Sequence, residues 1–542
     1  MDHLDAVVCG GGPAGLLTAI MLAQRFPTQH ISLFETNPDP PLSLEDDALW
    51  DSSDAMARFY TLGVFGRGKR ALEEFGVWED VAAISQELVG GQSWRSNTTV
   101  TKNSTQISMY ADLGRESIYA LPRDKLVSAL YQHIQQNYAT RISCHFGETV
   151  TPVSFDHFDN GTTSNVLLEI SPASSTTNET TRQVTTDFLI GADGAARTVA
   201  NRMEQVEAEE WKDKPLWQRL TSGRPFRVTR FPDTNPRVYK TIPIQLPPDW
   251  RRDIGYSASN SNDKTGRYAV VTLPSNTKGG LCAVLLMKDD DPMAQADTSP
   301  HDLRAILDEN VPIFSRLVND TVVAAVAQKP TSAFPFFRYA GPRLHKGDRT
   351  VILGDACHSV KPYNGLGVNT AFEDVRILSD ILEEHQSSNH NNNNNNHQQF
   401  YRSVVQAFSK SRAKDCKAVV NLARKGDRPD RIGRSLYLAT IIMDGIFHKV
   451  CPALFTVPVP GLIHNDNYRF RDVAVRKRWE RLAQVSILSL AGTLVWRLLR
   501  VLVATSARAL GMKDSTVALA LVGAAGALGI GQNMFKKSAT PA

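Results

Sequence analysis

The chain has 542 residues, of which 42% are hydrophobic and 21% are charged. These globular proportions exclude wholesale disorder and collagen-like structure, and the length allows about two to four domains. The 60 Lys and Arg residues nearly balance the 56 Asp and Glu residues, which disfavours a protein that binds nucleic acid through one basic face. The 6 cysteines are scattered without a CxxC pair, as in reduced intracellular proteins, and Met1 leads straight into an apolar strand, so we expect no secretory signal peptide.

Residues 5–35 predict a β–α–β unit. An apolar strand over 6–9 precedes a glycine-rich turn, an apolar helix over 16–23 and a second strand over 31–34. Strands that alternate with helices are typical of α/β proteins, so we expect a Rossmann-like domain to open the chain.

Further helices are expected over 68–76 and 123–138. Between about 220 and 290 the pattern changes to short apolar runs separated by Gly, Asn, Pro and Asp. The predicted strands there are 238–246, 268–273 and 281–287. We expect an antiparallel sheet inserted into the α/β core.

A low-complexity segment follows in the last third of the chain. The asparagine run 391–396 lies between His390 and His397. It predicts a loop between two helices, with a metal site at the two histidines as the minor alternative.

Two apolar stretches lie near the C-terminus, at 485–495 and 517–530. Counted from Ser515 to Met534, the second has about 20 residues, which suffices for the ~30 Å of a bilayer core. Arginines interrupt the first, which we expect to lie in the membrane interface. A basic segment precedes both, formed by Arg469, Arg471, Arg476, Lys477, Arg478 and Arg481. Membrane attachment is therefore expected, and a helical hairpin packed on the protein is the alternative.

The turn after the first strand contains a GxGxxG motif with glycines at 10, 12 and 15. Such glycines permit a tight turn, close approach of the backbone to a pyrophosphate and close packing of helix against strand. Glu35, 20 residues after Gly15, ends the next strand, where its carboxylate can accept hydrogen bonds from ribose hydroxyls. We expect Pro13 and Ala14 in the same phosphate-binding turn.

Two more strand ends carry polar side chains. The strand up to Ile190 leads into Gly-x-Asp-Gly, with Asp193 as its acid, and the strand 351–353 delivers Asp355 to a turn. A ribityl hydroxyl can bind Asp355, and a glycine-spaced segment follows that can offer backbone N–H groups to a flavin ring edge. Its expected binding residues are Pro362, Gly365, Gly367, Val368 and Asn369. A structural role for His358 is favoured over that of a general base, and Cys357 is expected to be a small buried residue.

These three motifs in this order resemble those of the FAD-dependent monooxygenases with the para-hydroxybenzoate-hydroxylase-like fold. The resemblance implies that Glu35 and Arg123 hold the AMP half of FAD, that Asp355 binds the ribityl chain and that residues 367–369 lie beside the isoalloxazine. It also adds Arg58 and Asp193 to the cofactor-binding residues. The implied reaction uses O₂ and NAD(P)H, and NAD(P)H binds only transiently. We expect no dedicated catalytic acid or base and no metal.

Within that family the chain is most similar to the kynurenine 3-monooxygenases. The similar segments are 58–76, 369–374 and 468–479. The resemblance implies hydroxylation of a kynurenine-like aromatic substrate, with Arg95 and Tyr110 binding its carboxylate. It also implies a cytosolic catalytic body on the mitochondrial outer membrane or endoplasmic reticulum.

Departures from the family pattern keep two alternatives open. Leu366 stands where the family has glutamine, and the residues around Lys425 and Val457 do not match the family's asparagine and tyrosine. The alternatives are a membrane-associated flavoenzyme acting on a lipid or isoprenoid, as an epoxidase or reductase, and a flavin redox sensor with little turnover.

Four parts are expected along the chain. They are a FAD-binding Rossmann-like domain over 1–200, an antiparallel-sheet substrate domain over 201–340, a region over 341–465 that completes the FAD site with helices, and a basic segment with a C-terminal anchor over 466–542.

Overall fold

The computed structural model describes residues 2–44, 60–95, 107–113, 116–159, 163–173, 180–221, 223–259, 268–391, 397–428 and 430–511. The chain forms two compact units. The first contains Met1–Ile446 and Thr456–Val473, and the second contains Phe447–Phe455 and Ala474–Ala542.

A parallel sheet forms the centre of the first unit. Its strands, in spatial order, are β20 (Thr350–Ile352), β11 (Arg182–Gly191), β1 (Asp2–Cys9), β2 (Ile31–Glu35) and β8 (Ile142–Phe146). The apolar residues at the end of β1 are fully buried, as expected for a central parallel strand. Because all five strands run in the same direction, their carboxyl ends meet at one edge, and the three motif turns start there.

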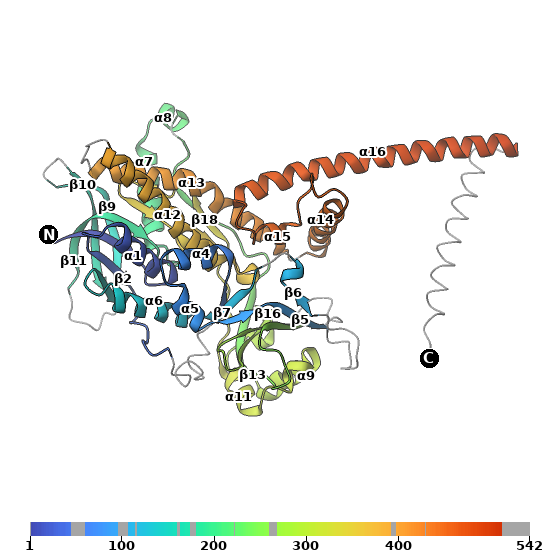
Figure 1. Ribbon diagram of the computed structural model, residues 1–542, viewed down its shortest axis with the longest axis horizontal. Coiled ribbons are helices and arrows are strands. Elements are labelled where there is room, and N and C mark those ends of the chain that lie inside the picture. Colours follow the sequence, from blue (N-terminus) through green and yellow to red (C-terminus); the bar gives the residue numbers. More distant parts are fainter. Residues whose placement is uncertain are drawn as a thin grey trace. The chain divides into compact units, whose positions relative to one another are not determined.

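Antiparallel strands extend this sheet, and helices cover it. The added strands are β9 (Glu148–Asp159), β10 (Thr163–Pro172) and β19 (His345–Lys346). Helix α1 packs against both α6 and α12 (Figure 1). The helices with contacts in this layer are α1 (Pro13–Arg25), α4 (Gly66–Glu74), α5 (Trp78–Ala83), α6 (Arg123–Asn137), α12 (Leu366–Asn391) and α13 (His397–Gly426).

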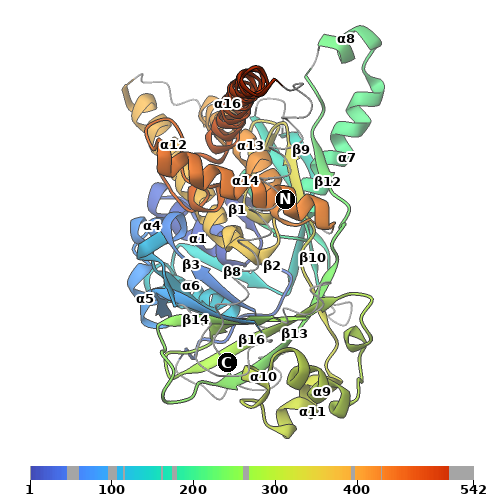
Figure 2. The ribbon, with the colours of Figure 1, turned by 90° about the vertical axis from the view of Figure 1, so that its right-hand side faces the viewer.

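A seven-stranded sheet forms a second layer with its own apolar core. Its spatial order is β17 (Ser332–Ala333), β13 (Arg237–Gln245), β16 (Gly280–Lys288), β15 (Ala269–Pro274), β14 (Ile254–Ser259), β5 (Gly90–Arg95) and β6 (Ser108–Met109). Helices α9 (Pro300–Asn310), α10 (Pro312–Ser315) and α11 (Asp320–Gln328) contribute to that core and lie below the sheet in Figure 2. All its pairs are antiparallel except β14 with β5.

Smaller elements complete the fold. Two three-stranded sheets contain β3 (Thr61–Val64), β7 (Ile118–Pro122) and β4 (Gln86–Leu88), and β12 (Arg227–Arg230), β18 (Arg338–Gly341) and β21 (His358–Ser359). The remaining helices are α7 (Thr198–Asp213), α8 (Leu216–Thr221), α14 (Arg431–Val450), α15 (Val459–Leu462) and α16 (Phe470–Leu510), with short 3₁₀ turns at Ala111–Leu113, Pro292–Ala294, Gly354–Ala356 and Pro362–Asn364.

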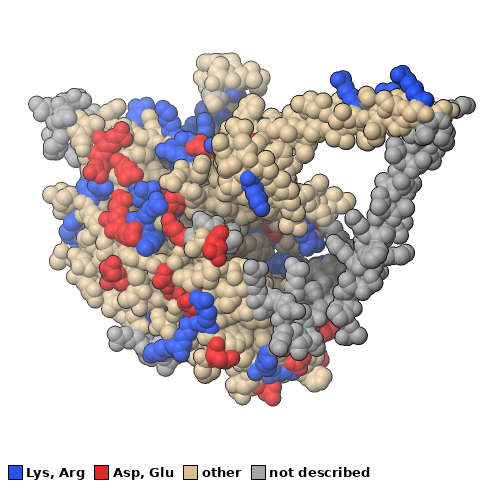
Figure 3. Space-filling model, turned by 45° about the vertical axis from the view of Figure 1, so that its right-hand side comes forward, with Lys and Arg blue, Asp and Glu red and all other residues tan. Residues whose placement is uncertain are grey.

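The second unit consists largely of the long helix α16 beyond residue 473. Its aliphatic side chains are exposed, and Figure 3 shows an uncharged surface along most of its length with Lys or Arg side chains toward its far end. The helix continues through Arg497 and Arg500, so the first apolar stretch is part of one continuous helix. By length and composition, Phe470–Ala509 is long and apolar enough to cross a membrane, with a mean hydropathy of 1.8 over its most apolar 18 residues.

The expected α/β fold with an antiparallel sheet and a helical C-terminal region is confirmed. Residues 392–396 of the asparagine run and the apolar stretch 517–530 lie outside the described residues. The seven-stranded sheet takes β5 and β6 from the part of the chain before residue 201. The four-part division of the chain stays a prediction.

Candidate functional site

The first motif turn is built so tightly that it excludes side chains. Gly10 has φ +107°, and a Cβ added there would lie 2.5 Å from the Ala192 carbonyl oxygen. A Cβ on Gly15 would lie 1.8 Å from the Gly10 carbonyl oxygen. Both glycines are therefore required by contact with backbone, which brings β1 and the start of α1 close together.

The N-terminus of α1 forms an anion-binding cradle. Gly12 is the N-cap, no side chain among the described residues caps the helix, and Pro13 and Ala14 form the first turn. A Cβ on Gly12 would meet only Nη2 of Arg123, at 3.6 Å. Backbone N–H groups and a guanidinium thus converge on one space, which suits a pyrophosphate.

Glu35 is fixed at the end of β2. Its Oε2 accepts a hydrogen bond from the Gly11 N–H at 2.6 Å, and its Oε1 accepts one from the Asn37 N–H at 2.9 Å. Oε1 also accepts a hydrogen bond from Nδ2 of Asn37 at 2.6 Å, so Oε2 is the oxygen with room for a ribose hydroxyl beside the phosphate cradle.

The second motif supplies Asp193, which caps α7. Its Oδ2 accepts from the Val199 N–H at 3.0 Å, while its buried Oδ1 has no partner among the described residues. Burial raises the pKa of Asp193 to about 6. A buried acceptor of this kind is open to a donor from a ligand.

Arg197 connects the second motif to the third. Its side chain is 1% exposed and donates through Nε to the Ala356 carbonyl at 3.3 Å and through Nη2 to the Asp355 carbonyl. Sequence analysis gave this arginine no role, because its partners lie about 160 residues further on. Arg197 positions the Asp355 turn through its backbone.

A buried ion-pair network holds the same turn from the other side. Asp374 of α12 accepts from the Gly354 N–H at 2.9 Å, lies 2.7 Å from Nε2 of His358 and accepts from Nε of Arg412 at 2.6 Å. Burial opposes charge on His358, but the Asp374 carboxylate outweighs it and raises the pKa of the imidazole to about 9. Burial likewise opposes charge on Asp374, and Arg412 and His358 overcome it to lower its pKa to about 2. His358 is thus a buried structural cation that is paired with Asp374 through Nε2, while its Nδ1 has no hydrogen-bond partner among the described residues.

The network continues away from the turn. Arg412 also pairs with Glu373 at 2.9 Å, and Glu373 pairs with Arg67 of α4. The potential ligand atoms of His358, Asp374 and Cys416 lie within 4.8 Å of one another. Because the Arg412 guanidinium already binds Asp374 there, a metal cation is disfavoured electrostatically.

The third motif continues into a loop and the start of α12. Gly365 has φ +60°, and a Cβ there would lie 3.0 Å from the Phe65 ring, whereas nothing lies within 4 Å of a Cβ on Gly367. Asn369 is 1% exposed; its Oδ1 accepts from the Phe65 N–H at 2.9 Å, and its Nδ2 donates to the Gly63 and Gly365 carbonyls, each at 2.8 Å. Its side chain therefore stabilises the loop, and only its backbone can face a ligand. Pro362 lies in the 3₁₀ turn before Gly365, and Val368 in the first turn of α12.

The Asp355 carboxylate lies between the two halves of the site. Burial raises its pKa, with His358, Arg197 and Arg123 acting in the opposite direction. No hydrogen bond from the described residues reaches this carboxylate. The residues present thus fit FAD: a phosphate cradle, an acid for the ribose, an acid for the ribityl chain and an open helix N-terminus for the ring.

The proposed substrate residues fall at opposite ends of β5. The backbone of Arg95 ends β5 opposite Ser259, and the Tyr110 N–H donates to the Val89 carbonyl at 2.8 Å, just before β5 begins. Gly90 and Arg95 are separated by about 16 Å at ~3.3 Å per residue. The Arg95 side chain and all of Arg58 lie outside the described residues.

An aromatic group that sequence analysis missed lies beside the loop of the third motif. The rings of Tyr239 and Phe334 stack with centroids 4.8 Å apart, and Phe334 meets Tyr363 edge-on at 5.6 Å. Tyr363 is 44% exposed. These residues are distant in sequence, so no local pattern could have indicated the group.

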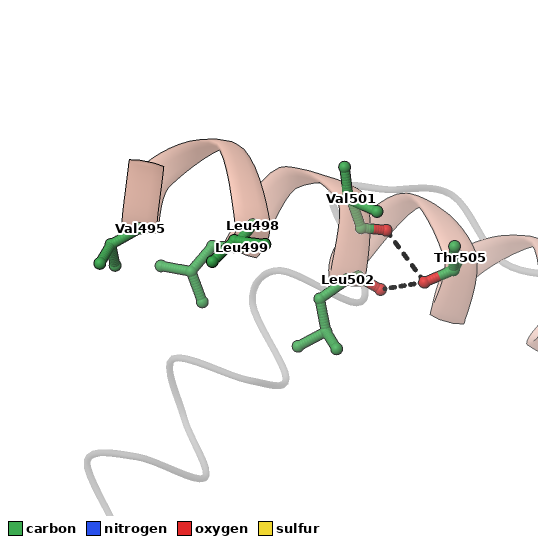
Figure 4. A pocket seen from close by; sticks show the side chains of 6 residues that line it. All are labelled: Val495, Leu498, Leu499, Val501, Leu502 and Thr505. Carbon is green, nitrogen blue, oxygen red and sulfur yellow. Dashed lines mark hydrogen bonds between the residues drawn. The ribbon is translucent and has the colours of Figure 1, made fainter. Parts of the chain in front are cut away.

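A hollow elsewhere is lined, among the described residues, almost entirely by aliphatic side chains. It lies on α16, and the described residues lining it are aliphatic apart from Thr505 (Figure 4). The Thr505 hydroxyl donates to the Val501 carbonyl at 2.9 Å. This hollow is an apolar helix surface and not an active site.

Comparisons with known proteins agree with this geometry. Residues 291–393 match a model of the FAD binding domain. The chain is 26% identical to kynurenine 3-monooxygenase from Salinispora tropica over 92% of this chain and 96% of that protein, and 23% identical to kynurenine 3-monooxygenase 2 from Aspergillus niger over 87% and 91%.

Solved structures share the fold. p-Nitrophenol 4-monooxygenase PnpA from Pseudomonas putida DLL-E4 has a TM-score of 0.54 at 16% identity, covering 87% of this chain and 99% of that one. PqsL from P. aeruginosa, in complex with 2-aminobenzoylacetate, has a TM-score of 0.53 at 16% identity, covering 80% and 98%. The expected fold class and its FAD-binding part are thereby confirmed.

Proposed function

We propose that this protein is an FAD-dependent monooxygenase that uses NAD(P)H and O₂ to hydroxylate kynurenine or a closely similar aromatic amino acid. The observation that carries the proposal is the similarity to kynurenine 3-monooxygenases along nearly the whole of both chains. At 92% of this chain, the similarity includes the second and third motif turns and the sheet that lies between them in sequence.

The cofactor is assigned to residues by chemistry. The α1 N-terminus and Arg123 would hold the pyrophosphate, Glu35 the adenosine ribose, and Asp355 the ribityl chain. Gly367, Val368 and the backbone of Asn369 would lie along the ring edge. FAD supplies the redox and oxygen-transfer chemistry when bound. The chain's own part is to bind, orient and exclude water.

Substrate binding is assigned to the seven-stranded sheet and the aromatic group. Arg95 would clamp the carboxylate, because a guanidinium binds a carboxylate through two parallel hydrogen bonds. Tyr110 is proposed as a substrate-binding residue from the family resemblance alone; because it lies at the opposite end of β5 from Arg95, it would contact another part of the substrate. The faces of Tyr239, Phe334 and Tyr363 suit stacking with a planar aromatic ring.

Attachment to a membrane is proposed through the C-terminal helix. The hydroxyls of Ser486, Thr493 and Thr505 each donate to the carbonyl four residues earlier, at 2.8–2.9 Å. Hydroxyls satisfied within their own helix suit an apolar surrounding. A cytosolic catalytic body at the mitochondrial outer membrane or the endoplasmic reticulum remains the proposal for location.

The direct test is NAD(P)H oxidation by purified, detergent-solubilised protein, with and without L-kynurenine, while the flavin absorbance is recorded. We expect kynurenine to accelerate flavin reduction and to yield a hydroxylated product. An FAD-loaded protein whose reduction rate ignores kynurenine would overturn the substrate and leave the cofactor assignment intact.

Variants sharpen the substrate assignment. Arg95→Ala should raise KM for kynurenine roughly 10- to 100-fold, because it removes about 1.5–3 kcal/mol of charge-assisted hydrogen bonding. The flavin content should change little. Arg182→Ala, which removes an exposed ion pair with Glu148, is the matched control and should leave KM unchanged. Equal KM values for both variants would remove Arg95 from the site.

A further inference from the structure

Helix α14 exposes an apolar face along the part up to Ile446 that belongs to the first unit. Its large exposed side chains are Ile432 (75% exposed), Leu436 (63%), Leu438 (56%), Ile442 (62%) and Ile446 (58%). At 3.6 residues per turn these positions fall within an arc of about 160°. A helix on the surface of a protein in water normally turns such an arc toward the core.

One charged side chain of α14 is buried on the side opposite the apolar arc. Asp444, the only acidic residue in the helix sequence, is 1% exposed and falls roughly opposite the centre of the apolar arc. Thr440 returns its hydroxyl to the Tyr437 carbonyl at 2.6 Å. The amphipathic pattern is therefore inverted relative to a water-exposed helix, which indicates an apolar neighbour on the outside.

The charges around this face are of both signs: Asp430, directly before the helix, is exposed, and so are two cations. Arg428 is exposed just before the helix, and Lys449 follows Ile446 by three residues in the sequence. No acid falls within the apolar arc. Cations flanking aliphatic side chains complement the anionic headgroups and the acyl chains beneath them.

We propose that the apolar face of α14 lies in the interfacial region of a phospholipid bilayer, as a monotopic contact additional to α16. Chain continuity favours a bilayer over a second copy of the chain. Residues 451–469 join α14 to α16, whose most apolar window has a mean hydropathy of 1.8 and is 0% buried. The last turn of α14, residues 447–450, belongs to the same compact unit as α16 beyond residue 473, so a bilayer that holds α16 is within reach of α14. The inference rests on the membrane attachment proposed above.

Spin labelling of the full-length, FAD-loaded protein tests this contact. Labels are placed at Ile442→Cys and Ile446→Cys, after Cys144→Ser and Cys451→Ser remove the two incompletely buried cysteines. The matched control is Glu209→Cys, an exposed position on α7. The protein is reconstituted into vesicles of phosphatidylcholine and phosphatidylglycerol, and collisions with O₂ and with a nickel chelate are compared.

We expect the ratio of O₂ to nickel accessibility at the α14 labels to exceed the control at least fivefold in vesicles. A ratio equal to the control would overturn the proposal. A high ratio that persists in detergent, with spin–spin broadening that grows with protein concentration, would assign the face to a second copy and also overturn it.

Two measurements on the same samples separate this inference from the function. Loss of kynurenine-stimulated NAD(P)H oxidation with a high accessibility ratio would overturn the substrate and retain the lipid contact. Normal turnover with an accessibility ratio equal to the control would overturn the lipid contact and retain the substrate. Flavin absorbance shows in each case that the labelled chain is folded.

Discussion

At the scale of single residues, the site depends on glycines at which no side chain fits. A Cβ added at Gly15 would lie only 1.8 Å from the Gly10 carbonyl oxygen. Because that atom belongs to the backbone, the backbone itself would have to move. That oxygen belongs to the turn in which the phosphate cradle begins. Steric exclusion at one residue therefore controls the affinity for the cofactor.

We predict that Gly15→Ala lowers FAD affinity at least tenfold, because α1 must shift away from β1 and its N–H groups leave the phosphates. The flavin-to-protein absorbance ratio after gel filtration measures this. Gly445→Ala is the control: nothing lies within 4 Å of its Cβ, and alanine favours a helix interior over glycine by about 1 kcal/mol. Full flavin content in Gly15→Ala would contradict the role of the turn.

His358 and Asp374 make the stability depend on pH. The pKa of His358 is about 9 in the folded protein against 6.5 for a free histidine, so its contribution is complete below pH 6.5 and lost as the pH rises through 9. The pKa of Asp374 is about 2 against 3.8, so its contribution is present above 3.8 and lost as the pH falls toward 2. Both groups are charged between these limits.

We predict that the unfolding free energy of the wild type exceeds that of His358→Asn by an amount on the order of 1–3 kcal/mol at pH 6. This difference should shrink as the pH rises to about 9.5, where the imidazole is neutral in both folded and unfolded chains. Urea unfolding of both proteins across this range is the measurement. A constant difference would mean that His358 is neutral in the folded state.

At the scale of elements, helices differ in what they bury. Helix α1 is buried from Gly15 to Ala23, whereas α16 exposes aliphatic side chains such as Leu498 at 69% and Val501 at 60%. A large exposed apolar surface is unfavourable in water and stable against lipid. The same hydrophobic effect thus gives the two helices opposite surroundings.

Removing the exposed part of α16, together with all residues after it, should release the protein from the membrane. A chain ending at Gln484 is expected to move from the pellet to the supernatant after extraction with alkaline carbonate, while the full chain stays in the pellet. Its flavin content is expected to persist, because all assigned FAD residues precede position 370. Pelleting of the shortened chain would remove α16 as the anchor.

At the scale of the whole molecule, the site joins segments that are hundreds of residues apart. The cradle comes from residues 10–15, Arg123 from α6, and Asp355 from the turn after β20. A ligand that bridges them must stabilise the first unit as a whole, because it binds only when all are in place.

We predict that FAD at 100 times its Kd raises the unfolding free energy of apoprotein by about 2.7 kcal/mol, seen as a Tm increase of a few degrees. FMN, which lacks the AMP half, should give less than half that shift. Glu35→Ala should reduce the FAD shift and leave the FMN shift unchanged, as read by differential scanning fluorimetry. Equal shifts for FAD and FMN would remove the AMP half from the proposed cradle.

The local pattern of the sequence determined much of this fold. The strand, glycine turn, helix and acid over residues 5–35 follow from steric limits and periodicity within a few residues, and the structure has them at the expected places. The helix from Arg123 and three strands of the 220–290 region were predicted for the same reason, whereas β12 and β14 of that region were not.

Only the tertiary structure decided how these pieces cooperate. Arg197 reaches the carbonyls of Asp355 and Ala356, Asp374 gathers His358 and Arg412, and β5 pairs with β14 far along the chain. Local periodicity is blind to such contacts, because each depends on two segments meeting after the chain has folded. The same reason hid the inverted face of α14: a row of aliphatic residues has the same spacing whether it meets a core or a bilayer.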